Sequence, residues 1–228
     1  MLAGQSNMAG RGLVAAEDTL PSERILSITS RGELIYAKEP LHFYEPSRTG
    51  LDGGLSFGKE LILHIPDSIA VLLIPTAVGG TSVSQWLNDS THRTVRLLSN
   101  FKDKLAIGKL HGEIKGILWH QGEADANPQN IPFYKERLTA LMARFRNITA
   151  QADLPILLGE LGSFSLKNAY WQSINEQIRQ VSAADKNTAV IHTQDLKGQQ
   201  DHEHFNAKGQ RQLGKRFATQ FLQLNATQ

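Results

Sequence analysis

The sequence predicts an α/β fold in which a mainly parallel sheet is covered by helices on both faces. Residues 69–74 form a continuous apolar run, which is typical of a central parallel strand buried on both sides. Segments with strand character alternate with segments of helical spacing along the whole chain. Several strand segments end in polar or glycine-rich turns, at the edge where such sheets bind ligands. These turns are therefore where we expect the chemistry.

The N-terminal part of the chain contains three short apolar segments. Residues 1–3 read as the last residues of a buried strand, and they leave open that a leader and the first half of this strand are missing. Residues 24–28 are a plausible second strand, with residues 34–36 as a short partner. Prolines, glycines and mixed charges at 40–54 predict a surface loop that can form one wall of a cleft.

The rest of the chain continues the alternation. Helical spacing predicts a helix over 56–64 that stops before Pro66. The remaining helices are predicted over 91–105 (with breaks), 133–150, 170–183 and 207–222, and the remaining strands over 114–119, 155–159 and 188–192. No linker or internal repeat interrupts this pattern, so we expect a single domain over residues 1–228.

Composition excludes several functional classes. The net charge of +2 is too small to indicate nucleic-acid binding, and no long run of Lys and Arg is present. The absence of cysteine excludes disulfides, thiolate nucleophiles and zinc–thiolate sites. No apolar run is long enough to span a bilayer, so no membrane partner is expected, and the sequence shows no signal-peptide pattern. Localisation stays open between the cytoplasm and export.

The first polar turn carries Ser6. This serine follows the apolar residues 1–3 and is flanked by glycines that allow a sharp turn. A hydroxyl at the carboxyl end of a strand, on a turn into a helix, is placed to act as a nucleophile. An ordinary helix N-cap is the alternative interpretation of the same turn.

A base and a carboxylate stand together near the C-terminus. Asp201 and His204 lie three residues apart in a loop ahead of the last predicted helix. A hydrolytic serine needs a histidine to take its proton and a carboxylate to orient that histidine. The alternative is a surface histidine near a helix whose cap is Asn206.

Two further turns offer hydrogen-bond donors. Acyl transfer generates an oxyanion that donors fixed in advance stabilise. The backbone N–H of Ser6, the amide of Gly80 and the side chain of Gln121 can form a three-donor oxyanion hole. A tight turn at Gly80 and a loop-capping amide at Gln121 are the alternatives. One site explains all the polar turns more economically than separate structural roles.

These motifs resemble the SGNH hydrolase superfamily, and within it the branch of carbohydrate esterase family 6 and the sialate O-acetylesterases. The resemblance rests on Gly-Gln-Ser-Asn-Met at 4–8, Gly-Gly-Thr-Ser at 79–82, Trp-His-Gln-Gly-Glu at 119–123 and Asp-x-x-His-Phe at 201–205. It covers essentially the whole chain. It implies a three-layer α/β/α fold of flavodoxin type with a mainly parallel, five-stranded sheet, and hydrolysis of acetyl esters on sugars without a cofactor.

The resemblance also implies roles by position. Ser6 matches the nucleophile, His204 the general base, and Ser6, Gly80 and Gln121 the oxyanion donors, with Gln121 where the wider superfamily has asparagine. Asp201 matches the superfamily's orienting acid, whereas Glu123 matches the carboxylate assigned to some family 6 esterases. We favour Asp201, because it shares a loop with the base.

Other residues are weaker candidates. Arg11 follows the serine turn, where a structural salt bridge competes with substrate contact. Trp86 and Trp119 are candidates to stack on a sugar, with Trp119 expected in the core. His202 and His204 with Glu203 lack further ligands at metal-site spacing, so no metal is expected. We expect solvation for His202, packing or a hydrogen bond within its loop for His120, and a structural role for Glu160.

The sequence therefore predicts a serine esterase that removes O-acetyl groups from a carbohydrate. Acetylated xylan, O-acetyl sialic acid and other acetylated glycans remain alternative substrates, since specificity lies in loops such as 40–54. A catalytically silent carbohydrate-binding module on the same fold is an alternative of a different class. Oligomeric state is left open by these motifs.

Overall fold

Parallel strands form the centre of the molecule. The computed structural model describes residues 1–226, and its larger sheet has four parallel strands in the order β1-β7-β8-β9. These strands are β1 (Leu2–Gly4), β7 (Ile117–His120), β8 (Ile156–Gly159) and β9 (Thr188–Ile191). A second sheet has the order β3-β2-β4, with β2 (Ile25–Ile28) parallel to β4 (Val71–Leu73) and antiparallel to β3 (Leu34–Tyr36).

One parallel bridge between Leu2 and Pro75 joins the two sheets. The Leu2 N–H donates to the carbonyl of Ile74, and the Thr76 N–H donates to the carbonyl of Leu2, both at 2.8 Å. Pro75 follows Val71 and Leu73 at two-residue spacing, so its nitrogen faces β2. Proline has no N–H, and it therefore cannot continue the ladder with β2. The expected five-stranded sheet is therefore replaced by a four-stranded sheet bridged to a three-stranded one.

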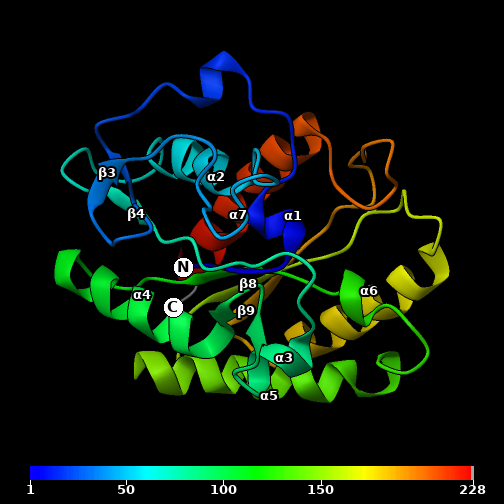
Figure 1. Cartoon of the computed structure of the whole chain (residues 1–228). Coiled ribbons are helices and arrows are strands. Elements are labelled where there is room, and N and C mark those ends of the chain that lie inside the picture. The colour runs from blue at the N-terminus through cyan, green and yellow to red at the C-terminus, as the bar shows by residue number, and fades with distance from the viewer. Residues whose placement is uncertain (227–228) are drawn as a thin grey trace.

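Helices cover both faces of the sheet, which confirms the α/β/α layering (Figure 1). One face carries α2 (Gly54–Leu61) and α7 (Ala207–Ala226), and the other carries α4 (Leu97–His111), α5 (Ile131–Thr149) and α6 (Asn168–Ala183). Successive strand residues point to opposite faces. Trp119 and Leu158 accordingly join the core beneath α4, α5 and α6, whereas Leu118 and Leu157 join the core beneath α2 and α7.

Short helical turns lie in the segments between the strands and the longer helices. They are α1 (Ser6–Ala9), η1 (Ala16–Asp18), α3 (Val83–Leu87) and η2 (Glu123–Asp125). Gly4, at the end of β1, has a φ of 137°, and a Cβ there would lie 2.0 Å from the carbonyl oxygen of His120. Only glycine allows β1 to approach β7 this closely before the chain turns into α1.

Two predicted segments differ from the structure. The expected broken helix over 91–105 opens instead with a hairpin of β5 (Thr91–His92) and β6 (Val95–Arg96), and α4 begins only at Leu97. The two residues that connect β5 and β6, Arg93 and Thr94, have φ values of 46° and 71°. Such turns favour glycine or asparagine, and neither occurs there, so the usual hairpin signal is missing.

The apolar run at 69–74 is also less buried than expected. Leu73 and Ile74 are buried, but Ile69 is 48% exposed, because the ladder with β2 starts only at Val71. The other predicted segments agree with the structure to within four residues at either end. Among residues 1–226, no helix combines the length and apolar character that crossing a bilayer requires.

Candidate active site

The predicted site residues come from separate segments that meet at one edge of the sheet. Ser6 follows β1, Gln121 follows β7, and Gly80 lies in the turn after the residues that bridge β1. Asp201 and His204 lie in the loop between β9 and α7. Because the strands of the larger sheet are parallel, their carboxyl ends all lie at this edge.

Ser6, His204 and Asp201 form a continuous line of hydrogen bonds. The Nε2 atom of His204 lies 3.0 Å from Oγ of Ser6, and its Nδ1 atom lies 2.7 Å from Oδ2 of Asp201. A carboxylate that accepts from Nδ1–H leaves Nε2 as the acceptor for the serine hydroxyl. The arrangement is therefore suited to removing a proton from Ser6.

Asp201 is itself held in place by backbone donors. Its Oδ1 atom accepts hydrogen bonds from the N–H groups of Glu203 at 2.9 Å and His204 at 3.0 Å. Partial burial raises the pKa of Asp201, but the bonds from Glu203 and His204 outweigh it and leave the pKa below its ordinary value. Asp201 is therefore a carboxylate at neutral pH.

Glu123 lies close to these residues without a hydrogen bond to His204. Its Oε1 atom accepts a hydrogen bond of 2.5 Å from Nδ2 of Asn7. Burial raises the pKa of Glu123 to about 7. Of the two carboxyl groups that the sequence left as alternatives, Asp201 contacts the histidine ring and Glu123 contacts the residue after Ser6.

Two backbone donors beside the serine are free. Within residues 1–226, the N–H groups of Ser6 and Gly80 have no protein acceptor. Gly80 has a φ of 79°. It is exposed, whereas the neighbouring Thr81 is buried. The left-handed backbone is the conformation that glycine adopts without strain. These N–H groups are available to an incoming oxygen atom.

The side-chain amide of Gln121 is arranged differently from the expected open donor. It is fully buried, and its Nε2 atom lies 2.6 Å from Oδ2 of Asp125, 3.0 Å from the carbonyl of Thr81 and 3.2 Å from Oε1 of Gln5. An amide nitrogen has two hydrogens, and here three protein acceptors surround it. The amide therefore braces the turns that carry Ser6 and Gly80.

The Gly80 turn is supported by an ion pair that the sequence motifs did not indicate. Oε2 of Glu45 accepts from the Gly79 N–H at 2.7 Å and from Arg11 at 2.8 Å, and Oε1 lies 3.3 Å from Arg93. Arg11 thus occupies the structural salt bridge that was one of its two alternatives. Glu45 and Arg93 belong to a loop and a hairpin without motif character, so only their proximity identifies them.

The remaining candidates are structural in the described residues. Trp86 is fully buried and packs edge-to-face on Trp119 with 5.4 Å between ring centroids, so the prediction that Trp86 can stack on a sugar is wrong. The ring of Trp86 packs in the hydrophobic core beneath α5, where a sugar has no access to it. His202 is exposed. His120 donates from Nε2 to the carbonyl of Glu160 at 2.9 Å, and the Glu160 carboxylate accepts from Arg179.

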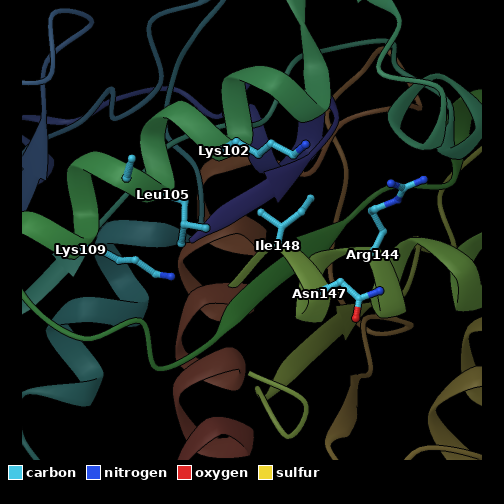
Figure 2. Close-up of a pocket in the computed structure, with 7 residues that line it drawn as sticks. Lys102, Leu105, Lys109, Arg144, Asn147 and Ile148 are labelled. Atoms are coloured by element: carbon cyan, nitrogen blue, oxygen red, sulfur yellow. The ribbon is translucent and has the colours of Figure 1, made fainter. Parts of the chain in front are cut away.

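No group of three or more His, Asp or Glu side chains within residues 1–226 is arranged to hold a metal ion. A surface groove of about 530 Å³ lies elsewhere, between α4 and α5. Figure 2 shows it lined by Lys102, Leu105 and Lys109 of α4 and by Arg144, Asn147 and Ile148 of α5. None of these residues belongs to the polar turns around Ser6, so the groove is separate from the candidate active site.

Comparisons with known proteins match almost the whole chain. A family model described as "Carbohydrate esterase, sialic acid-specific acetylesterase" matches residues 1–223. A probable carbohydrate esterase of Arabidopsis thaliana is 27% identical over 240 residues, which cover 97% of this chain and 89% of the relative. An X-ray structure of an Arabidopsis thaliana protein aligns with a TM-score of 0.85 and 25% identity, covering 97% of this chain and 96% of the other.

Two more distant structures share the fold. The crystal structure of NanS aligns with a TM-score of 0.71 and 16% identity over 100% of this chain and 97% of the other. A carbohydrate acetylesterase from Xanthomonas citri aligns with a TM-score of 0.76 and 17% identity, covering 99% of this chain and 56% of the other.

Proposed function

The chain belongs to the family of carbohydrate esterases described as sialic acid-specific acetylesterases, and we propose that it acts as an SGNH-type serine esterase on O-acetylated carbohydrates. The observation that carries the proposal is the hydrogen-bonded line from Asp201 through His204 to Ser6, with distances of 2.7 and 3.0 Å. We further propose that residues 1–228 form one catalytic domain.

In the first half of the reaction, His204 takes the proton of Ser6 as the serine oxygen attacks the acetyl carbonyl. The negative oxygen that develops is stabilised by the free N–H groups of Ser6 and Gly80. We expect Gln121 to contribute less as a direct donor, because its amide already faces three protein acceptors. His204 then gives its proton to the departing sugar hydroxyl, which leaves an acetyl group on Ser6.

In the second half, His204 removes a proton from water, and the resulting hydroxide attacks the acetyl-enzyme. Acetate leaves and Ser6 recovers its proton from His204. Throughout, Asp201 holds Nδ1–H and stabilises the imidazolium, for which its lowered pKa is suitable. The cycle uses only groups of this chain, water and the acetyl ester.

The test is hydrolysis of 4-nitrophenyl acetate by the wild type and by the variants Ser6→Ala, Asp201→Asn and Glu123→Gln. We expect Ser6→Ala to lower kcat at least about 10³-fold and Asp201→Asn about 10²- to 10⁴-fold, with a much smaller effect of Glu123→Gln. Ser173→Ala on the exposed side of α6 is the matched control. Full activity of Ser6→Ala would refute the scheme, and a larger loss in Glu123→Gln than in Asp201→Asn would assign the orienting role to Glu123.

A second assay of the wild type asks which acetylated carbohydrate it hydrolyses fastest. The family's specificity for sialic acid acetyl esters favours O-acetyl sialic acid over acetylated xylan as the substrate. We therefore expect faster acetate release from O-acetyl sialic acid. A folded wild type that binds these glycans and releases no acetate from them or from 4-nitrophenyl acetate would instead be a carbohydrate-binding module.

A further inference from the structure

We propose that Asn7 is a positioning residue that holds His204 against Ser6, and that Glu123 reinforces the orientation of the Asn7 amide. This inference rests on the proposed function, because it assigns a role in placing the base of that reaction. It also gives Glu123 a function other than that of the orienting acid.

Asn7 bonds to the peptide groups on both sides of His204. Its Oδ1 atom accepts from the N–H of Phe205 at 3.0 Å, and its Nδ2 atom donates to the carbonyl of Glu203 at 3.1 Å. Asn7 is only 1% exposed. The residue that directly follows the nucleophile therefore holds the backbone before and after the base, across 196 to 198 positions of sequence.

The backbone of Asn7 is fixed by α7, the helix that follows the loop carrying Asp201 and His204 (residues 192–206, the histidine loop). Nε2 of Gln210, a fully buried residue of α7, donates to the carbonyl of Asn7 at 2.9 Å. A second contact closes the loop, since Nε2 of Gln199 donates to the carbonyl of Arg11 at 2.6 Å. The histidine loop is thus attached to the segment after Ser6 at several points.

Glu123 adds a third hydrogen bond to the Asn7 amide and reinforces the direction in which it faces. The second Nδ2 hydrogen of Asn7 is donated to Oε1 of Glu123 at 2.5 Å, and the side chain of Glu123 is 1% exposed. An acceptor at this position requires nitrogen on this side of the amide, and hence leaves Oδ1 for the Phe205 N–H. Without it the amide keeps the orientation that the Phe205 N–H and the Glu203 carbonyl require, but it loses one of its three hydrogen bonds and is held less firmly.

The required property of Glu123 is an oxygen acceptor and not a charge. His120 donates from Nε2 to the Glu160 carbonyl, so the Nδ1 atom that lies 3.8 Å from Oε1 of Glu123 carries a lone pair. A neutral carboxyl fits beside this lone pair, and it still offers an oxygen to Asn7. A glutamine at position 123 offers the same oxygen, whereas leucine offers none.

The experiment measures kcat and KM for 4-nitrophenyl acetate together with the rate at which diisopropyl fluorophosphate labels Ser6. We expect Asn7→Ala and Glu123→Leu to lower kcat about 10²-fold with little change in KM, and to slow labelling in parallel, because the base is displaced from the nucleophile. Glu123→Gln should lose only a few-fold. Asn147→Ala, on the exposed side of α5, is the matched asparagine control.

A double variant tests the contact directly. Asn7→Asp alone places two carboxyl groups against each other and should be as impaired as Asn7→Ala. Combined with Glu123→Gln, the donor and acceptor of the contact between residues 7 and 123 exchange places, while the bond to the Glu203 carbonyl stays lost in both proteins, so we expect a partial, several-fold recovery of kcat over Asn7→Asp. Because both proteins in this comparison carry Asn7→Asp, the comparison holds even where Asn7→Ala folds poorly.

Three results would overturn the inference, the second and third of them on the role of Glu123. One is an Asn7→Ala enzyme whose kcat and labelling rate equal those of the wild type per folded molecule. The second is an effect of Glu123→Gln as large as that of Glu123→Leu, and the third is no recovery in the double variant. Ser6→Ala distinguishes a failure of the proposed function from a failure of this inference. An active Ser6→Ala protein contradicts the proposed function itself. An inactive Ser6→Ala protein together with a fully active Asn7→Ala protein contradicts only the role of Asn7.

Discussion

At the scale of single residues, the two carboxyl groups near His204 differ because of their surroundings. Asp201 is partly exposed and accepts hydrogen bonds from the histidine ring and two backbone N–H groups, which leave its pKa lowered. The side chain of Glu123 is buried and accepts a hydrogen bond from Asn7, and burial raises its pKa to about 7. Opposite shifts in neighbouring carboxyl groups are a sign of different roles. One is suited to stabilise an imidazolium, and the other to hold a side chain in place.

The raised pKa of Glu123 predicts a pH-dependent stability. In the folded chain this carboxyl keeps its proton up to about pH 7, and in the unfolded chain it loses it near pH 4.5. The folded state therefore binds more protons between these values, and its stability falls as pH rises through this window. The contribution present at low pH and lost by pH 8 is on the order of 3 kcal/mol.

Urea unfolding of the wild type and of Glu123→Gln at pH 5 and pH 8 measures this contribution. Between pH 5 and pH 8 the free energy of unfolding of the wild type should fall relative to that of Glu123→Gln, because only the wild type carries the carboxyl that ionises. A difference that is independent of pH would show that Glu123 titrates normally in the folded chain.

At the scale of elements, the Gly79–Gly80 turn is held by a loop and a hairpin. Glu45, in the 40–54 loop, accepts from Gly79 N–H and pairs with Arg11, whose side chain is 10% exposed. Burial raises the pKa of Glu45, but the bond and charge of Arg11 outweigh it, and the pKa lies below its ordinary value. From the hairpin, Nε2 of His92 approaches the carbonyl of Gly79 at 3.0 Å. The position of the Gly80 N–H thus depends on segments that carry no catalytic side chain.

Removing the Glu45 carboxylate should therefore affect both stability and activity. Glu45→Ala leaves the largely buried Arg11 charge without its carboxylate partner and the Gly79 N–H without its acceptor, and we expect a loss of about 3–5 kcal/mol in the free energy of unfolding. kcat should fall as well, because the Gly80 N–H is no longer fixed. Denaturant unfolding and 4-nitrophenyl acetate hydrolysis at a temperature where the variant is folded measure both effects.

Two controls accompany this variant. Glu45→Gln retains an acceptor for Gly79 and should keep more activity than Glu45→Ala. Glu33→Ala removes an exposed partner of Arg31, with side chains 55% and 81% exposed, and should change stability by less than about 0.5 kcal/mol. A normal kcat in folded Glu45→Ala would mean that the Gly80 turn does not depend on this ion pair.

At the scale of the whole molecule, α7 connects the stability of one sheet face to the candidate site. It starts at Ala207, directly after the histidine loop, and packs along α2 on that face (Figure 1). Phe217 of α7 is 1% exposed and belongs to the same core as Leu118 and Leu157 of the sheet. The helix that ends the histidine loop is therefore anchored by hydrophobic packing over much of its length.

We expect Phe217→Ala to lower the free energy of unfolding by about 3–5 kcal/mol, because it leaves a cavity between α7 and the sheet. Phe133→Ala is the matched control, since Phe133 is 49% exposed and its loss should cost about 1 kcal/mol or less. Urea unfolding of the two variants measures the difference. Equal losses in both would contradict the assignment of α7 as a closing element of this core.

The sequence by itself determined the alternation of strands and helices and the α/β/α class. It also brought together the residues now found near Ser6, because each polar turn follows an apolar strand segment and parallel strands end at one edge. Apolar periodicity is a local property that survives small differences in packing. For this reason most elements, and the motifs with Ser6 and His204, could be identified without coordinates.

Only the tertiary structure decided which of these residues touch. It placed Asp201 on His204 and Glu123 on Asn7, directed the Gln121 amide to Asp125, and buried Trp86 in the core. It also ended the β2–β4 ladder at Leu73, two residues before Pro75, and formed a hairpin at a turn that lacks glycine and asparagine. The bond between Asn7 and Glu123 joins residues 116 positions apart, and the others join residues close in sequence. Each depends on displacements of less than an ångström, and such displacements are set by the packing of the whole chain rather than by local pattern.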